Sequence, residues 1–175
     1  MLKQVLEVVD LLDDATVNGK KVEAYLQGKG AAAIHVETVS SPKGSTDFIQ
    51  IKIPGKTGRT NGGIGARPEQ IGFVSDGDGA AAAIAAAAKL IEMQAKGDTL
   101  DGDVIIATHI CPDAPTRPHD PVPFMDSPTD ILTMNKYEVS PEMEAILSID
   151  TTKGNRVINH KGIAISPTVR EGYVL

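Results

Sequence analysis

The sequence is poor in aromatic residues and in cysteine: it has three Phe, three Tyr, no Trp and one Cys among 175 residues. So few rings leave little surface for stacking nucleic-acid bases. The net charge of -6 likewise offers no basic stripe to neutralise phosphates. We therefore expect no nucleic-acid partner. A single Cys excludes an internal disulfide framework, which points to a reducing compartment.

Long apolar segments are also missing. The longest, residues 79–88, is mostly alanine and ends at Lys89. A membrane helix needs about 20 strongly apolar residues, so none is predicted. Residues 1–14 carry acidic side chains inside their apolar pattern, unlike a signal peptide. The sequence predicts a cytoplasmic protein without a membrane partner.

What the sequence does contain is aliphatic: 41% of its residues are hydrophobic. A chain of this length fits one domain and can bury roughly 70% of its unfolded surface. Ala, Ile, Val and Leu must supply the core because the aromatic residues are so few. We expect a single α/β domain over residues 1–175.

Hydrophobic patterns predict helices and strands in mixed order. Helices are expected over 2–14, 20–26 and 78–96, and strands over 33–39, 46–53, 71–75, 103–108, 145–149 and 157–165. Glycine-rich and proline-rich loops are expected over 54–67 and 111–128. The central order of strand, helix and strand predicts a three-layer α/β fold with a mixed, mostly parallel sheet.

Ligands of such sheets bind at the carboxyl ends of the strands. Asp76 and Asp78 follow the strand expected at 71–75 and precede the alanine-rich helix. Two carboxylates separated by one Gly suit a divalent cation. Asp78 has an alternative role as the cap of that helix, where its side chain accepts from free backbone N–H groups.

A second polar cluster follows the strand expected at 103–108. It contains His109, Cys111, Asp113 and His119, which offer imidazole, thiolate and carboxylate groups in a proline-rich loop. These groups suit a metal, although their spacing matches no strong zinc template. Cys111 is alternatively a nucleophile with a histidine base, or an inert buried thiol in a rigid loop.

A third cluster follows the strand expected at 145–149. Asp150 is a candidate metal ligand, and Thr151 is a candidate for binding substrate. Lys153 would neutralise a carboxylate or a developing oxyanion, or else point into solvent from a turn. Arg67 is a further substrate-binding candidate, in a glycine-rich loop that lacks the context of a dinucleotide fingerprint.

Three long motifs are similar to one protein family. They are GGIGARPEQIGFVSDGDGA (62–80), GDVIIATHICPDAPTRPHDPVPFMDSP (102–128) and AILSIDTTKGNRVINHKGIAISPTVREGY (145–173). On these motifs the sequence resembles the domain of unknown function 1177 family, closely over 62–175 and more loosely before. The resemblance implies no activity.

The order of elements also resembles, more distantly, the catalytic domain of two-metal aminopeptidases of the tetrahedral and glutamyl types. This resemblance implies a zinc-exopeptidase-like fold with zinc, or alternatively manganese or cobalt, as the divalent metal. It implies that Asp76, or else Asp78, bridges the metals, and that Asp150 is a ligand. Those enzymes have an early His-x-Asp motif, for which His35 and Glu37 are a weak counterpart.

The chain departs from those enzymes where they carry a Glu-Glu pair, because Cys111 and Pro112 stand there instead. His109, Asp113 or His119 would have to replace the missing base. The resembling family is also longer, and residues 169–175 end in an apolar run. We therefore expect a homo-oligomer, or a chain incomplete at its C-terminus and completed by a second polypeptide.

Three functions of different classes follow. The favoured one is a metal-dependent hydrolase of an amide or peptide-like small substrate. The second is a metal-free binder of an acidic metabolite that uses Arg67 and Lys153. The third is an assembly subunit of a split protein with a C-terminal partner chain.

Overall fold

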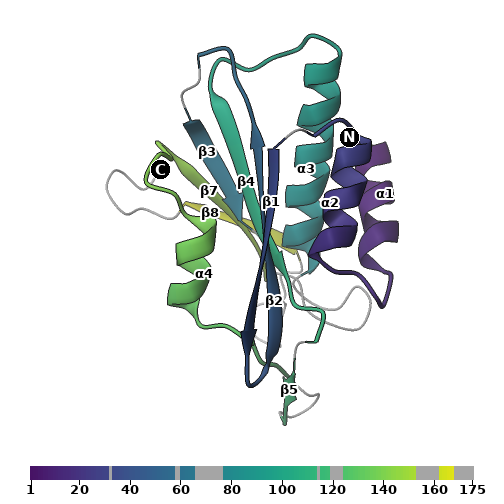
Figure 1. The fold of residues 1–175 in the computed structure, drawn as a ribbon, viewed down its shortest axis with the longest axis vertical. Helices are drawn as coiled ribbons and strands as arrows, with labels where there is room; N and C mark the ends of the chain where they lie inside the picture. The colour runs from purple at the N-terminus through teal and green to yellow at the C-terminus, as the bar shows by residue number, and fades with distance from the viewer. Residues whose placement is uncertain are drawn as a thin grey trace.

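The computed structural model describes residues 1–31, 33–57, 60–65, 77–113, 115–118, 124–152 and 162–167. In this part of the chain a six-stranded sheet carries three helices on one side and a shorter helix on the other (Figure 1). None of the helices within these ranges is long and apolar enough to cross a membrane.

Helices and strands alternate irregularly along the chain. In order they are α1 (Leu2–Leu12), α2 (Gly19–Gly28), β1 (Ala33–Ser41), β2 (Gly44–Ile53), β3 (Thr60–Gly65), α3 (Gly77–Ala95), β4 (Asp103–Ile110), β5 (Thr116–Arg117), β6 (Phe124–Met125), α4 (Ile131–Glu138), β7 (Ile146–Thr152) and β8 (Gly162–Pro167). Strands β5 and β6 form a separate two-stranded ribbon.

The sheet is mixed, with strand order β1-β2-β4-β3-β7-β8. Among the described strands, only β3 makes parallel pairs, with β4 and β7. The pairs β1–β2, β2–β4 and β7–β8 are antiparallel. The prediction of an α/β chain with a mixed sheet is confirmed, whereas most strand pairs in the described part of the chain are antiparallel, contrary to the prediction of a mostly parallel sheet. The parallel unit is limited to the central strands, because β2 follows β1 after a short turn and β2 and β8 run antiparallel to β4 and β7.

A central strand was missed by the sequence pattern. Residues 54–67 were expected to be a loop, yet β3 lies between β4 and β7. Its sequence TNGGIG contains one aliphatic residue and three glycines, a composition depleted in strands. Backbone pairing on both sides therefore decides its conformation, and local propensity does not.

The helices α1, α2 and α3 cover one side of the sheet and enclose the core. Its fully buried members include Val8, Val22, Leu26, Ile51, Ile84 and Ile106. Helix α3 contributes buried alanines at 80, 81, 83, 85, 87 and 88. Their small side chains let this helix lie close to the strands.

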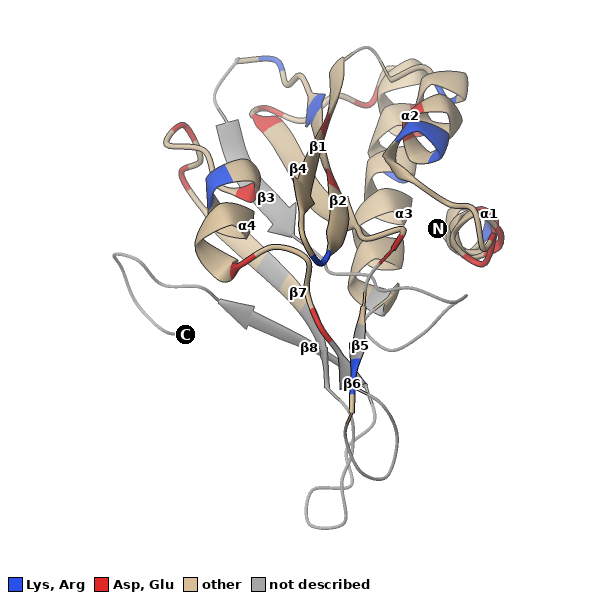
Figure 2. Cartoon of the chain, turned by 60° about the horizontal axis from the view of Figure 1, so that its bottom comes forward, with Lys and Arg blue, Asp and Glu red and all other residues tan. Residues whose placement is uncertain are grey.

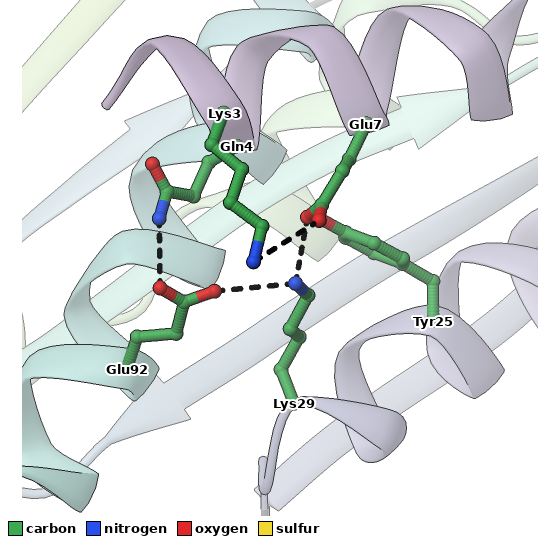
Figure 3. A network of polar contacts seen from close by, with 6 residues as sticks. All are labelled: Lys3, Gln4, Glu7, Tyr25, Lys29 and Glu92. Carbon is green, nitrogen blue, oxygen red and sulfur yellow. Dashed lines mark hydrogen bonds and ion pairs between the residues drawn. The ribbon is translucent and has the colours of Figure 1, made fainter.

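One polar network ties the three helices together (Figure 3). The Lys29 ammonium, after α2, lies 2.6 Å from Glu7 of α1 and 3.2 Å from Glu92 of α3. Gln4 donates to Glu92, and the Tyr25 hydroxyl donates to Glu7. Lys29 holds the pKa of both carboxyls below the ordinary range, and burial together with Glu7 raises the pKa of Tyr25 to about 12.

Helix α4 lies on the other side of the sheet and was not predicted. Asp130 caps it, accepting from the backbone N–H groups of Leu132 and Thr133 at 2.9 Å each. Tyr137 stacks on Phe48 of β2 with ring centroids 4.7 Å apart. One short helix covers only part of this side, so the full three-layer, zinc-exopeptidase-like arrangement stays a prediction.

Candidate functional site

The carboxyl ends of β4, β3 and β7 lie side by side at one edge of the sheet, because these three strands are adjacent and parallel. Helix α3 follows β3 in the chain and begins with Gly77. Figure 2 turns this edge toward the reader, with β5 and β6 beside it. The topology therefore provides the edge at which α/β sheets bind ligands.

Two of the candidate ligands lie at the same level of this edge. Ile106 of β4 and Leu147 of β7 both pair with Ile64 of β3, so the three form one row across the sheet. His109 and Asp150 each lie three residues further along their strands. Two strand spacings separate them, about 10 Å between backbones.

His109 lies within β4, which continues to Ile110, rather than at the end of a strand as expected. Its side chain is 2% exposed, and its Nδ1 lies 2.5 Å from Oε1 of Glu138. A carboxylate only accepts hydrogen bonds, so Nδ1 carries the hydrogen. This arrangement fixes the ring and leaves Nε2 as the nitrogen for a base or a metal ligand.

Glu138 is the partner of His109 that sequence reasoning missed. It is the last residue of α4, and its side chain is 17% exposed. Asp130 before the apolar Ile131 and Leu132 is a helix-start signal that would have located α4. Nothing in the local pattern connects Glu138 with His109, 29 residues earlier.

Cys111 follows β4 and is 3% exposed. Its Sγ lies 3.4 Å from Oγ1 of Thr46, which is also 3.4 Å from Oγ1 of Thr129. The described neighbourhood of the thiol thus includes neutral hydroxyl groups. This fits a buried structural thiol, and the nucleophilic role of Cys111 stays a prediction.

The loop after Cys111 lies against the β1–β2 turn. Gly44 has a φ of +135°, and a Cβ there would be 2.6 Å from the carbonyl oxygen of Asp113. Lys43 donates to Asp126 at 2.7 Å from the same turn. The turn therefore fixes the backbone of Asp113, whose side chain is exposed.

The structure describes only some of the remaining candidate site residues. Asp78 is the second residue of α3, and Asp150 and Thr151 lie in β7, all by backbone position. Four others lie outside the described residues: Arg67, Asp76, His119 and Lys153. Within the described part of the chain, no three His, Cys, Asp or Glu side chains gather into a group that could hold a metal ion.

Two further buried carboxylates hold backbone segments. Asp47 accepts from the Gly19 N–H at the start of α2 and from the Thr38 hydroxyl, each at 2.7 Å. Asp103, at the opposite end of β4, accepts from the Gly55 N–H at 2.7 Å, which holds the pKa of this carboxyl below its usual range. Because their oxygens bind backbone and side-chain donors, these groups serve the fold.

Comparison with known proteins identifies a family. The family model described as "Protein of unknown function (DUF1177)" matches residues 37–175. No curated protein matches the chain.

Several solved structures are similar at low identity. Macrostomum lignano glutaminyl cyclase is 13% identical, with 89% of this chain and 54% of that chain covered and a TM-score of 0.49. A variant of tomato leucine aminopeptidase is 13% identical, with 63% and 28% covered and a TM-score of 0.40. An Acidobacteriales bacterium glutaminyl cyclase is 16% identical, with 61% and 42% covered and a TM-score of 0.39. The chain spans about half or less of the length of these proteins.

Proposed function

The chain belongs to the DUF1177 family of proteins of unknown function, and we propose that it is a metal-dependent hydrolase of an amide or peptide-like small substrate. The observation that carries this proposal is the buried His109–Glu138 pair near the carboxyl edge of the sheet. The family match assigns no chemistry, so the proposal depends on the residues themselves.

The first argument is the tautomer of His109. Histidines that bind metals almost always donate their second ring N–H to a carboxylate or a carbonyl, which fixes the ring and raises the basicity of the ligating nitrogen. Glu138 supplies such a carboxylate at 2.5 Å from Nδ1. Placement inside β4 holds the imidazole on a rigid strand, as a preformed metal ligand requires.

The second argument is the composition of the candidate ligand set. Asp150 shares the level of His109 two strands away, and Asp76 and His119 are the other proposed ligands. Imidazole nitrogen and carboxylate oxygen are the usual partners of zinc, and manganese or cobalt are alternatives. A bound divalent cation would polarise the substrate carbonyl and lower the pKa of a bound water.

The other candidates take supporting roles in this proposal. Asp78 or Asp113 would act as the proton-accepting group, and Cys111 would be the alternative nucleophile. Substrate binding is assigned to the side chains of Arg67, Thr151 and Lys153. The cations among them would bind a carboxylate of the substrate or neutralise a developing oxyanion.

Metal content tests the proposal directly. We expect protein purified without chelator to hold stoichiometric zinc, manganese or cobalt by elemental analysis, and His109→Ala to lose it. Glu138→Gln keeps the shape of the side chain but weakens the acceptor, and should reduce metal affinity about 10- to 100-fold. Glu144→Ala removes an exposed carboxylate outside the candidate site and serves as the control with unchanged metal content.

Activity is then measured on aminoacyl amides and short peptides with the metal-loaded protein. His109→Ala should abolish hydrolysis, and circular dichroism should show that the variant is folded. A wild-type protein without stoichiometric metal would contradict the proposal and favour the metal-free binder of an acidic metabolite. Metal retained at full occupancy by folded His109→Ala would exclude His109 as a ligand.

A further inference from the structure

Strand β1 forms one edge of the six-stranded sheet. It pairs with β2 on one side, and no other strand among the described segments pairs with its outer side. Such an edge offers unpaired N–H and C=O groups to another strand. Natural edges are commonly protected by proline or lysine, but the nine residues of β1, AIHVETVSS, contain neither.

The two sides of β1 differ in chemistry. The register with β2 places Ile34, Val36 and Thr38 on the side of the helix-covered core, where Thr38 donates to buried Asp47. His35 and Glu37 therefore lie on the opposite side. Their side chains are 72% and 48% exposed, and His35 Nε2 lies 3.8 Å from a Glu37 carboxylate oxygen.

This order of residues is complementary to itself in the antiparallel direction. When two copies of β1 pair about a two-fold axis at Val36, His35 of each copy lies opposite Glu37 of the other, twice. On the core side, Ile34 lies opposite Thr38, and the two Val36 side chains lie opposite each other. An imidazole can donate its ring N–H to a carboxylate opposite it, and pairs of β-branched residues are favourable across strands.

Neighbouring registers lack this match. An axis at His35 would place the two His35 side chains opposite each other, and an axis at Glu37 would place two carboxylates opposite each other. Two carboxylates directly opposite repel each other, and two His35 rings opposite each other leave each Glu37 without an imidazole partner opposite it. We propose that the chain forms a homodimer in which β1 pairs antiparallel with β1 of a second copy about a two-fold axis at Val36.

The proposed dimer joins the two sheets into one and keeps the helix layers of both copies on the same side. The axis is perpendicular to the sheet, so each copy uses its edge once and the assembly closes as a symmetric pair. Main-chain hydrogen bonds supply the attraction, and the two His35–Glu37 pairs select the register.

Charge substitutions on β1 test the dimer and its register. We expect the wild-type protein to be a dimer by light scattering and sedimentation. Glu37→Lys sets a cation opposite His35 twice and should weaken dimerisation at least about tenfold. Glu144→Lys changes the net charge equally at an exposed residue outside β1, and should leave the dimer intact.

The double variant His35→Glu with Glu37→Lys places a carboxylate opposite an ammonium group twice, and should restore dimerisation. Both β1 positions point to solvent, so circular dichroism should confirm a native fold for each variant. A wild-type monomer at the highest soluble concentration would overturn the proposal. So would a dimer that is insensitive to Glu37→Lys, or one that the double variant fails to restore.

Cysteine cross-linking tests the axis independently. Only a residue on the two-fold axis lies opposite the same residue of the second copy. Val36→Cys should therefore give a covalent dimer under mild oxidation. Ile34→Cys is the matched control on the same side of β1, and should not cross-link because it faces Thr38 of the other copy. Equal cross-linking of both variants, or none by Val36→Cys, would contradict this register.

Discussion

Close approaches of single residues fix how α2 lies on the sheet. Gly19, the first residue of α2, donates its N–H to buried Asp47 at 2.7 Å. A Cβ at Gly19 would lie 2.6 Å from Cγ1 of Val36 and 2.8 Å from Cβ of Asp47. The helix can therefore reach its anchor on β2 only because this position has no side chain.

We expect Gly19→Ala to lower the free energy of unfolding by about 1–3 kcal/mol, because the added methyl group must displace Val36 or Asp47. Gly28→Ala, at the last residue of the same helix, is the control. Nothing lies within 4 Å of its Cβ position, so the exchange should be neutral or slightly stabilising. Urea unfolding followed by circular dichroism measures both, and equal stability of Gly19→Ala and wild type would contradict the packing argument.

Also at the scale of single residues, the sequence identified His109 as a candidate site residue but contained no sign of its partner Glu138. A polar residue after a run of buried aliphatic residues marks the end of a strand as a place for chemistry. Its partner comes from α4, on the other side of the sheet, and lies 2.5 Å away only after folding. Local pattern can therefore find the imidazole, but the side chain that sets its tautomer needs the tertiary structure.

At the scale of elements, the ammonium group of Lys29 links three helices. Lys29 contacts Glu7 and Glu92 from a side chain that is 18% exposed, and its Nζ lies 5.4 Å from the centre of the Tyr25 ring. This cation lowers the pKa of both carboxyls from their ordinary 4.5. The lowered pKa values link the packing of α1 and α3 to pH.

A carboxyl with a lowered pKa adds stability that is fully present above its unfolded value and is lost as pH falls through its folded value. We expect the wild type to lose stability below about pH 5, and Lys29→Met to lose less over the same range. Lys56→Met is the control, because Lys56 is 63% exposed and lies 3.9 Å from exposed Asp101. Urea unfolding as a function of pH measures the slopes, and identical slopes for Lys29→Met and wild type would contradict the linkage.

Element prediction succeeded where side-chain periodicity is strong and failed where it is weak. The pattern located α1, the β1–β2 pair and α3 to within a few residues. It missed β3, whose glycines carry no periodic signal, and α4, which is only eight residues long. Neighbouring strands, and not local propensity, decide the conformation of β3. The local signal for α4 is confined to its cap at Asp130.

At the scale of the whole molecule, the proposed metal would join distant parts of the sheet. Its candidate ligands come from β4, from β7 and from segments that follow strands of the same edge. A ligand that binds only the folded state stabilises it by mass action, and the effect covers every element that the ligand connects.

Removal of metal should therefore lower the melting temperature by about 5–10 °C, and return of zinc should restore it. In His109→Ala the melting temperature should not respond to chelator or zinc. Differential scanning calorimetry with and without chelator makes the comparison, and the control Glu144→Ala should respond as the wild type does. A wild-type melting temperature that does not change when chelator is added would count against a structural contribution from metal.

The sequence by itself determined an aliphatic α/β chain, its main helices and first two strands, and polar clusters after its strands. Composition and periodicity carry this information because burial and backbone geometry act on residues that are close along the chain. Only the tertiary structure decided that most of the described strand pairs are antiparallel, that TNGGIG is a central strand, and that Glu138 meets His109. These features depend on contacts between distant segments, whose energies no local pattern contains.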